Sequence, residues 1–180
     1  MSDTILFFAY HSLTLLFGVV LSVAFCGLRF TKKNGFAFLS LLIFSSILQL
    51  VVFNLLGEKA VWELYPLITH LPLLLLLQLI FRKRLVTAIS AISSAYLCCH
   101  PSKWIGLLVE MFIPNDSVVW IIRILLMSLF VFIAIRFLAP YISEIFNEDN
   151  RSVQIFSVVP MVYYVFDYVV SVYTDFLASH

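Results

Sequence analysis

The sequence predicts an all-α integral membrane protein, a bundle of six transmembrane helices with a short interfacial helix after the fourth. Two observations predict this class. Of the 180 residues, 63% are hydrophobic and only 12% are charged, which leaves too little polar surface to cover a soluble domain. The apolar residues also fall into six runs of about 20, the length that a helix needs to cross a bilayer. No period-2 alternation supports a β-barrel.

The six runs form a single polytopic domain over residues 1–180. The first run follows Met1 closely and lacks the basic region and the cleavage site of a signal peptide, so we expect a retained crossing. Net charge is +1 and no basic face is present, so no nucleic-acid partner is expected. The expected spans, in order, are residues 5–28, 36–56, 64–81, 85–103, 118–138 and 153–177.

The third and fourth spans differ in character. In the third, PLLLLLQLIF (Pro72–Phe81) offers a leucine surface that suits lipid, and Pro66 and Pro72 predict a bend near His70. In the fourth, Ala91 and Ala95 form a small-xxx-small pattern, which lets helix backbones approach closely. The fourth span is therefore expected to be central, with several helices packed on it.

The end of the fourth span is set by length. Leu85 to Cys99 is 15 residues, roughly 22 Å of helix, which is short of a core of about 30 Å. The span therefore runs on to about Lys103, although Pro101 weakens it. Residues 104–112 then predict a short helix in the outer interface, beginning with Trp104. One long kinked helix to Phe112 is the alternative.

Basic residues predict the orientation. Only Lys59 and Lys103 lie on one side, whereas eight basic residues follow or flank the first, third and fifth spans. Cytoplasmic connections are enriched in Lys and Arg, so these three connections are expected in the cytosol of a bacterial cell. The N-terminus is then outside, and so is His180 after six crossings. The eight are Arg29, Lys32, Lys33, Arg82, Lys83, Arg84, Arg136 and Arg151.

Ionisable residues within the spans predict a ligand-binding site. Each costs roughly 2.5–3.5 kcal/mol to insert, so it needs a partner or a cavity. Arg123 and Asp167 lie at similar depth in the outer half, which predicts that they pair, directly or through water. Alternatively, Arg123 extends to the surface and Asp167 is protonated.

Other polar residues share the outer half of the expected bundle. Helical spacing places Tyr164, Asp167 and Tyr168 on one face. A polar, aromatic cavity open to the outside would gather them as a binding site; alternatively, each bonds a neighbouring helix or belongs to the interfacial aromatic belt. The candidate ligand-binding residues are His70, Arg123, Asp167, Tyr164, Tyr168, His11 and Asn54.

The three cysteines predict neither a metal site nor a disulfide framework. Adjacent helical residues point about 100° apart, so Cys98 and Cys99 cannot both face one site. Zinc sites usually separate paired cysteines by two to four residues. No metal, cofactor or catalytic residue is therefore expected. A membrane protease that pairs His70 with Cys98 or Cys99 is an alternative that the spacing does not single out.

Three segments resemble a known family: LYPLITHLPL (Leu64–Leu73), AYLCCHPSKWIG (Ala95–Gly106) and VPMVYYVFDYVVSVYTD (Val159–Asp175). They look like the membrane-sensor half of clostridial sensor histidine kinases of the GHKL ATPase type, which are related in layout to the accessory-gene-regulator peptide receptors. The resemblance covers most of Leu64 to Asp175. It implies a two-component signal-sensing domain that receives a small extracellular ligand, such as a peptide, within a homodimeric kinase.

The kinase half of that family is absent. The sequence has no phospho-acceptor helix and no glycine-rich ATP lid, so no catalytic residue carries over and this chain is not expected to be an enzyme. A kinase would need a seventh crossing, so we expect either a sensor piece or a short relative. The alternative function is a small six-helix transporter or substrate-capture subunit, although the Ala-x-x-x-Ala of those subunits' first helix is here only Gly18-x-x-x-Ser22.

Overall fold

The computed structural model describes residues 2–29, 31–113, 115–147 and 150–173, and every regular element in these ranges is helical. Residue 180 and the end of the sixth expected span, residues 174–177, lie outside the described residues. The elements are α1 (Ser2–Phe25), α2 (Lys32–Leu56), α3 (Glu58–Tyr65), η1 (Pro66–His70), α4 (Leu71–Leu75), η2 (Leu76–Ile80), α5 (Leu85–Cys99), α6 (Pro101–Glu110), α7 (Asp116–Ile133), η3 (Ala134–Leu138), α8 (Ala139–Asn147) and α9 (Asn150–Tyr173). Three helical runs are irregular: π-helical turns follow α3 and α7, and a break at His100 separates α5 from α6.

Within the described residues, four helical runs are long and apolar enough to cross a membrane by length and composition. They are Asn34–Leu56, Lys59–Ile80, Asp116–Asn147 and Arg151–Val170. A shorter apolar helix covers Ala9–Phe25 of α1. These runs make a multi-pass membrane protein plausible.

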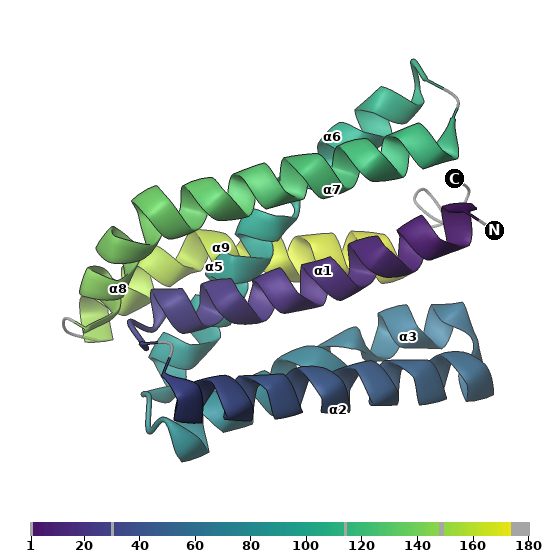
Figure 1. Cartoon of the computed structure of the whole chain (residues 1–180). Coiled ribbons are helices and arrows are strands. Elements are labelled where there is room, and N and C mark those ends of the chain that lie inside the picture. Colours follow the sequence, from purple (N-terminus) through teal and green to yellow (C-terminus); the bar gives the residue numbers. More distant parts are fainter. Residues whose placement is uncertain (1, 30, 114, 148–149, 174–180) are drawn as a thin grey trace.

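The long helices run up and down along one common direction (Figure 1). The turn from α1 to α2, the turn from η2 to α5, and the adjoining ends of α8 and α9 lie at the same end. The start of α1, the α2–α3 junction and the α6–α7 turn lie at the other end. The segments that hold Arg29 and Arg82 to Arg84 therefore share one end of the bundle, as the distribution of basic residues predicts.

Local signals explain several helix ends. The side chain of Thr31 accepts a hydrogen bond from the Asn34 N–H at the start of α2, and that of Asn115 accepts one from the Val118 N–H at the start of α7. After α1, Gly27 has φ +65°, a left-handed backbone conformation that glycine adopts without a steric penalty. Leu28 N–H then donates to the Val23 carbonyl, the bond that closes such helix ends.

α5 is the central helix, which confirms the expectation from its small residues. It runs obliquely between α1 and α9 and also packs against α4 and α7 (Figure 1). Ala88, Ala91 and Ala95 are at most 1% exposed, so the neighbouring backbones approach closely. The hydroxyls of Ser90 on α5 and Ser157 on α9 hydrogen-bond each other.

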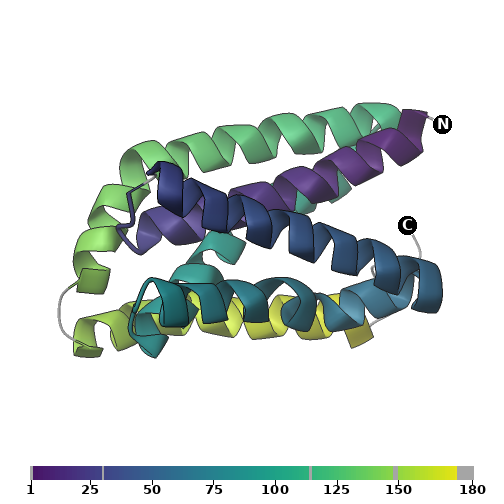
Figure 2. The same ribbon diagram turned by 60° about the horizontal axis from the view of Figure 1, so that its bottom comes forward.

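The run from α3 to η2 lies beside α2 and α9 (Figure 2). Its first π-helical turn begins at Pro66, one of the two prolines that predict a bend near His70. The expected leucine surface occupies one side only. Leu71, Leu75 and Leu79 are 41–70% exposed, whereas Leu73 and Leu77 are buried in the bundle.

The break after the fourth expected span comes earlier than predicted. α5 ends at Cys99 and α6 covers Pro101–Glu110, so the helix break lies two to four residues before the approximate limits expected for the fourth span, 103, and for the interfacial helix, 104–112. Pro101 has no N–H and interrupts the hydrogen-bond ladder. His100 nevertheless keeps helical angles, φ −78° and ψ −25°, so the helix is interrupted there without a loop.

The fifth helical run is longer than the expected 118–138. It extends from Asp116 through η3 to the end of α8 at Asn147. The extension is stabilised by packing, because Ile142 and Phe146 are buried and α8 contacts α1 and α9. Arg136 therefore lies within the helical run, in η3, and not in a connection.

Candidate functional site

Asp167 on α9 is a carboxylate buried inside the bundle, with 0% of its side chain exposed. It belongs to the buried stripe of α9, which includes Val153, Ser157 and Pro160 at helical spacing. Val165 and Phe166, which precede it directly, are 58% and 62% exposed on the opposite side. The position of Asp167 on the inner stripe therefore directs its carboxylate toward α5 and α6.

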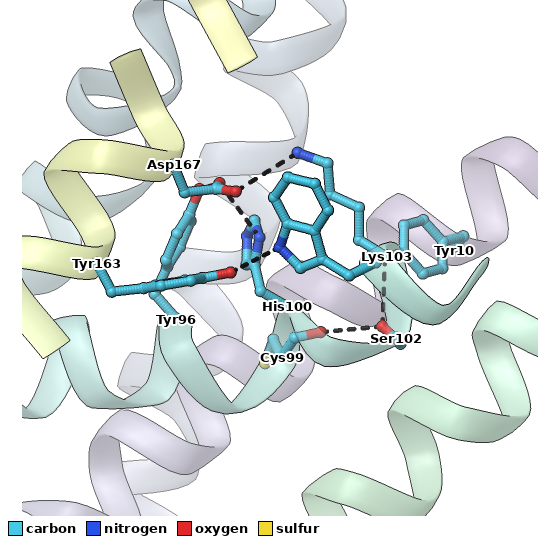
Figure 3. Close-up of polar contacts among 9 residues, drawn as sticks. Tyr10, Tyr96, Cys99, His100, Ser102, Lys103, Tyr163 and Asp167 are labelled. Atoms are coloured by element: carbon cyan, nitrogen blue, oxygen red, sulfur yellow. Dashed lines mark hydrogen bonds and ion pairs between the residues drawn. The ribbon is translucent and has the colours of Figure 1, made fainter. Parts of the chain in front are cut away.

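Three side chains from the α5–α6 segment surround this carboxylate (Figure 3). The hydroxyl of Tyr96 donates a hydrogen bond to Oδ2 of Asp167 over 2.7 Å. Nδ1 of His100 lies 3.2 Å from the same oxygen, and Nζ of Lys103 lies 3.9 Å from Oδ1. Tyr96, His100 and Lys103 are spaced by four and three residues, so one helical face presents all of them.

Aromatic rings enclose the carboxylate and its partners. The Tyr96 and His100 rings pack with centroids 3.8 Å apart, and the Tyr96 and Tyr164 rings with centroids 4.7 Å apart. The indole N–H of Trp104 donates to the hydroxyl of Tyr163 over 2.8 Å. These contacts join α9 to α5 and α6 by apolar surface as well as by charge, and this burial strengthens the electrostatic interactions of the carboxylate.

His70 joins the same cluster from the third run. Its Nδ1 lies 2.7 Å from the hydroxyl of Tyr164 in a hydrogen bond. The His70 ring also meets those of Tyr65 and Tyr96 edge-on, with centroids 5.1 and 5.7 Å apart. Three helical runs therefore meet at the polar cluster, which we define as Tyr96, His100, Lys103, Asp167 and the His70–Tyr164 pair.

A cavity of about 20 Å³ lies beside this cluster. Its walls come from α1, the third run and α5, and include Thr14, Tyr65, His70, Tyr96 and His100. A water molecule needs roughly 10–15 Å³ of such volume and two or more polar partners. The cavity is therefore large enough for about one water, and much smaller than the roughly 300–1,000 Å³ of a small-molecule pocket.

The expectation was that Arg123 and Asp167 pair, directly or through water, and the structure contradicts its direct form. Nη2 of Arg123 donates to Oε2 of Glu110 over 2.9 Å, and the guanidinium lies 4.8 Å from the ring centroid of Trp120. Its side chain passes over Gly106, where an added Cβ would lie 2.3 Å from Nε. Arg123 therefore holds α7 against α6, while Asp167 takes its partners from α5 and α6.

Two other candidate residues lie away from the polar cluster. The His11 ring packs against Tyr10 and Trp120, with centroids 5.4 and 6.3 Å apart, in the contact between α1 and α7. Asn54 is exposed on α2, and its side-chain amide donates to the Leu50 carbonyl. Tyr168 is half-buried, and its hydroxyl donates to the Glu63 carbonyl at the exposed contact between α9 and α3 over 2.6 Å.

Tyr96, His100 and Lys103 were not among the candidate residues from the sequence. Their signal was present in the Tyr-x-x-x-His-x-x-Lys spacing, which places them on one helical face. The expected span limit at Lys103 had assigned Lys103 to the membrane surface. The interruption at His100 instead leaves all three in register with Asp167.

No three histidine, cysteine or carboxylate side chains within the described ranges gather closely enough to hold a metal ion. The polar cluster instead offers one buried carboxylate, three basic side chains and several aromatic faces, a set suited to charge recognition. In comparisons with known proteins, no family model, curated protein or solved structure matches the chain.

Proposed function

We propose that the chain is a membrane-embedded signal-sensing domain, in which the polar cluster is the responsive centre. The observation that carries the proposal is the fully buried carboxylate of Asp167, held by groups from α5 and α6. Buried charges in a membrane bundle are costly and mark functional sites more often than structural ones. The carboxylate also connects separate helices, so a change in its partners changes helix packing.

A two-state response follows from this arrangement. In the described state, Asp167 holds α9 against α5 and α6. An external ligand that competes for the carboxylate or its partners would favour a state in which α9 is released or shifted. The ligand transmits a signal to the extent that it binds the two states with different affinity.

At the polar cluster, the small cavity favours a sensing contact over the substrate enclosure of the alternative capture subunit. A capture subunit must enclose its substrate, whereas a cavity of about 20 Å³ encloses about one water. A sensor needs only a contact that a ligand can disturb from the surface. Lys103, with 25% of its side chain exposed, provides a route from the surface to Asp167.

The proposal includes the orientation inferred from the basic residues. The first, third and fifth connections lie in the cytosol, and the α2–α3 and α6–α7 connections lie outside, with six crossings in all. Single cysteines at Lys83 and Lys59, in a background without the three native cysteines, test this in intact cells. A membrane-impermeant maleimide should label the cysteine at 59 and spare that at 83; the reverse pattern would refute the orientation.

The output we propose is control of a cytoplasmic histidine kinase, as the family resemblance implies. The test of this output uses membrane vesicles from source cells that carry the natural reading frame. ATP-dependent phosphorylation is measured in these vesicles with and without conditioned culture medium. Asp167→Asn should abolish the response to medium, and Tyr141→Phe, a change at a residue that is 70% exposed, should not. An unaltered response in Asp167→Asn, or no kinase activity linked to the chain, would refute the sensor function.

A further inference from the structure

We propose that the polar cluster is a binding site for a primary ammonium group, and that Lys103 occupies this site until a ligand's ammonium displaces it. This inference rests on the proposed sensor function and names the chemical class of the ligand. It starts from Oδ1 of Asp167, which is buried and receives no hydrogen bond from any residue that the structure describes.

The two carboxylate oxygens of Asp167 are held differently. Oδ2 accepts the hydrogen bond from Tyr96 and lies 3.2 Å from His100. Among the described residues, the Lys103 ammonium is the cation near Oδ1, at 3.9 Å, which is beyond the 2.7–3.2 Å typical of a hydrogen bond. Buried acceptors are nearly always hydrogen-bonded, and an exception points to a functional role. The carboxylate is therefore held in place by one oxygen and presents the other toward a cation.

Aromatic faces complete the surroundings of that cation. Nζ of Lys103 lies 5.6 Å from the ring centroid of Trp104, within the range of a cation–π interaction. The indole of Trp104 is fixed in turn by its hydrogen bond to Tyr163. A carboxylate oxygen beside a fixed aromatic ring is a combination that recognises ammonium groups, because it supplies opposite charge and a polarisable face together.

Lys103 is suited to exchange with a ligand. Its side chain is 25% exposed while Asp167 is 0% exposed, so the lysine lies between the carboxylate and the surface. Its contact with Oδ1 is too long for a strong bond, so a ligand ammonium at a hydrogen-bonding distance would bind more tightly. Displacement would also remove the Lys103 contact between α6 and α9, which links binding to helix packing.

The test uses the full chain purified in detergent micelles, with n-propylammonium chloride as the probe and 1-propanol as its neutral counterpart. Lys103→Ala removes the internal ammonium and should lower the melting temperature; propylammonium should raise it again in a saturable manner, and propanol should not. Lys59→Ala, at an exposed lysine, is the matched control: it should melt like wild type and respond to propylammonium as wild type does. Sodium chloride at equal ionic strength corrects for screening.

Asp167→Asn decides whether the carboxylate is the receptor. Loss of a charge-assisted hydrogen bond, about 1.5–3 kcal/mol, predicts a half-maximal propylammonium concentration at least about tenfold higher in Lys103→Ala/Asp167→Asn than in Lys103→Ala. Equal responses in these two variants, or an equal response to propanol, would overturn the inference. If Lys103→Ala does not fold, the same comparison is made between wild type and Asp167→Asn, where the response must again depend on Asp167.

Two sources supply such a group, namely a peptide with a free amino terminus and a small polyamine. Trialanine, N-acetyltrialanine and putrescine distinguish them in the same assay. A response to trialanine that acetylation abolishes identifies a peptide amine, and a response to putrescine alone identifies a polyamine; an equal response to the acetylated peptide would overturn ammonium recognition. Binding is measured without any kinase, so loss of amine binding with an intact Asp167-dependent kinase response would refute this inference alone.

Discussion

Gly106 allows the close contact between α6 and α7, and Gly106→Ala should destabilise the protein. An added Cβ would lie 2.3, 2.4 and 2.8 Å from Nε, Cγ and Cδ of Arg123, distances that non-bonded carbon atoms do not adopt. Arg123 must therefore move away from Glu110, which its Nη2 contacts at 2.9 Å, and from the face of Trp120.

The expected loss of unfolding free energy in Gly106→Ala can be estimated from the Arg123 contacts that the change would disturb. The Arg123–Glu110 bond is worth about 1 kcal/mol, because Glu110 is one-third exposed (33%) and solvent screens the pair. The contact with Trp120 adds roughly 0.5–2 kcal/mol. Replacing glycine by alanine within a helix returns roughly 0.5–1 kcal/mol. The expected net loss of unfolding free energy is about 1–2 kcal/mol.

Unfolding of the chain in mixed micelles, followed by circular dichroism, measures this loss. Gly18→Ala in α1 is the matched control, because no atom lies within 4 Å of an added Cβ at that helical glycine; it should be neutral or slightly stabilising. In an Arg123→Ala background the clash disappears, so Gly106→Ala should cost nothing there. The reasoning is refuted if Gly106→Ala behaves like Gly18→Ala, or if its cost persists without the arginine side chain.

Three further changes test other parts of the fold by the same unfolding measurement. Tyr96→Phe removes the hydroxyl that donates to Asp167 and should cost about 1.5–3 kcal/mol, whereas Tyr141→Phe at an exposed site should cost nothing measurable. Arg82→Gly should stabilise the protein by roughly 1 kcal/mol, because Arg82 has φ +52°, a strained conformation that glycine tolerates. A loss of stability would show that the backbone at Arg82 is not strained. Ala91→Leu should destabilise by roughly 1–3 kcal/mol, since this position is 0% exposed in the centre of the bundle; a neutral result would mean that the neighbours of α5 are not tightly packed.

The helical class and the central place of α5 could be predicted because both depend on composition and local spacing. Apolar runs of bilayer length require helices, and small residues at helical spacing require close neighbours. The π-helical turns could not be predicted, since a shift in hydrogen-bond register requires no distinctive residue type. The extension through α8 was missed because it depends on the burial of Ile142 and Phe146 against other helices.

The candidate site was predicted in part, and the error in it has a geometric origin. Helical spacing put Tyr164 and Asp167 on one face of α9, and the structure brings His70 to the same cluster through its hydrogen bond with Tyr164. Pairing also depends on how each helix is rotated about its axis, and that rotation is set by packing of the whole bundle. Arg123 shares the approximate depth of Asp167 but faces Glu110 on α6.

α6 explains why the two expected partners remain apart. Lys103, Gly106 and Glu110 are spaced by three and four residues, so one face of α6 presents a cation, a gap and a carboxylate. Asp167 on α9 contacts Lys103. Arg123 on α7 passes over Gly106 and hydrogen-bonds Glu110. Each buried charge thus finds an opposite charge on the same short helix, and a direct Arg123–Asp167 pair would leave Lys103 and Glu110 without these partners. Because this one helix holds both α7 and α9, a ligand that displaces Lys103 would loosen α6 at one contact while Arg123 still anchors it at the other.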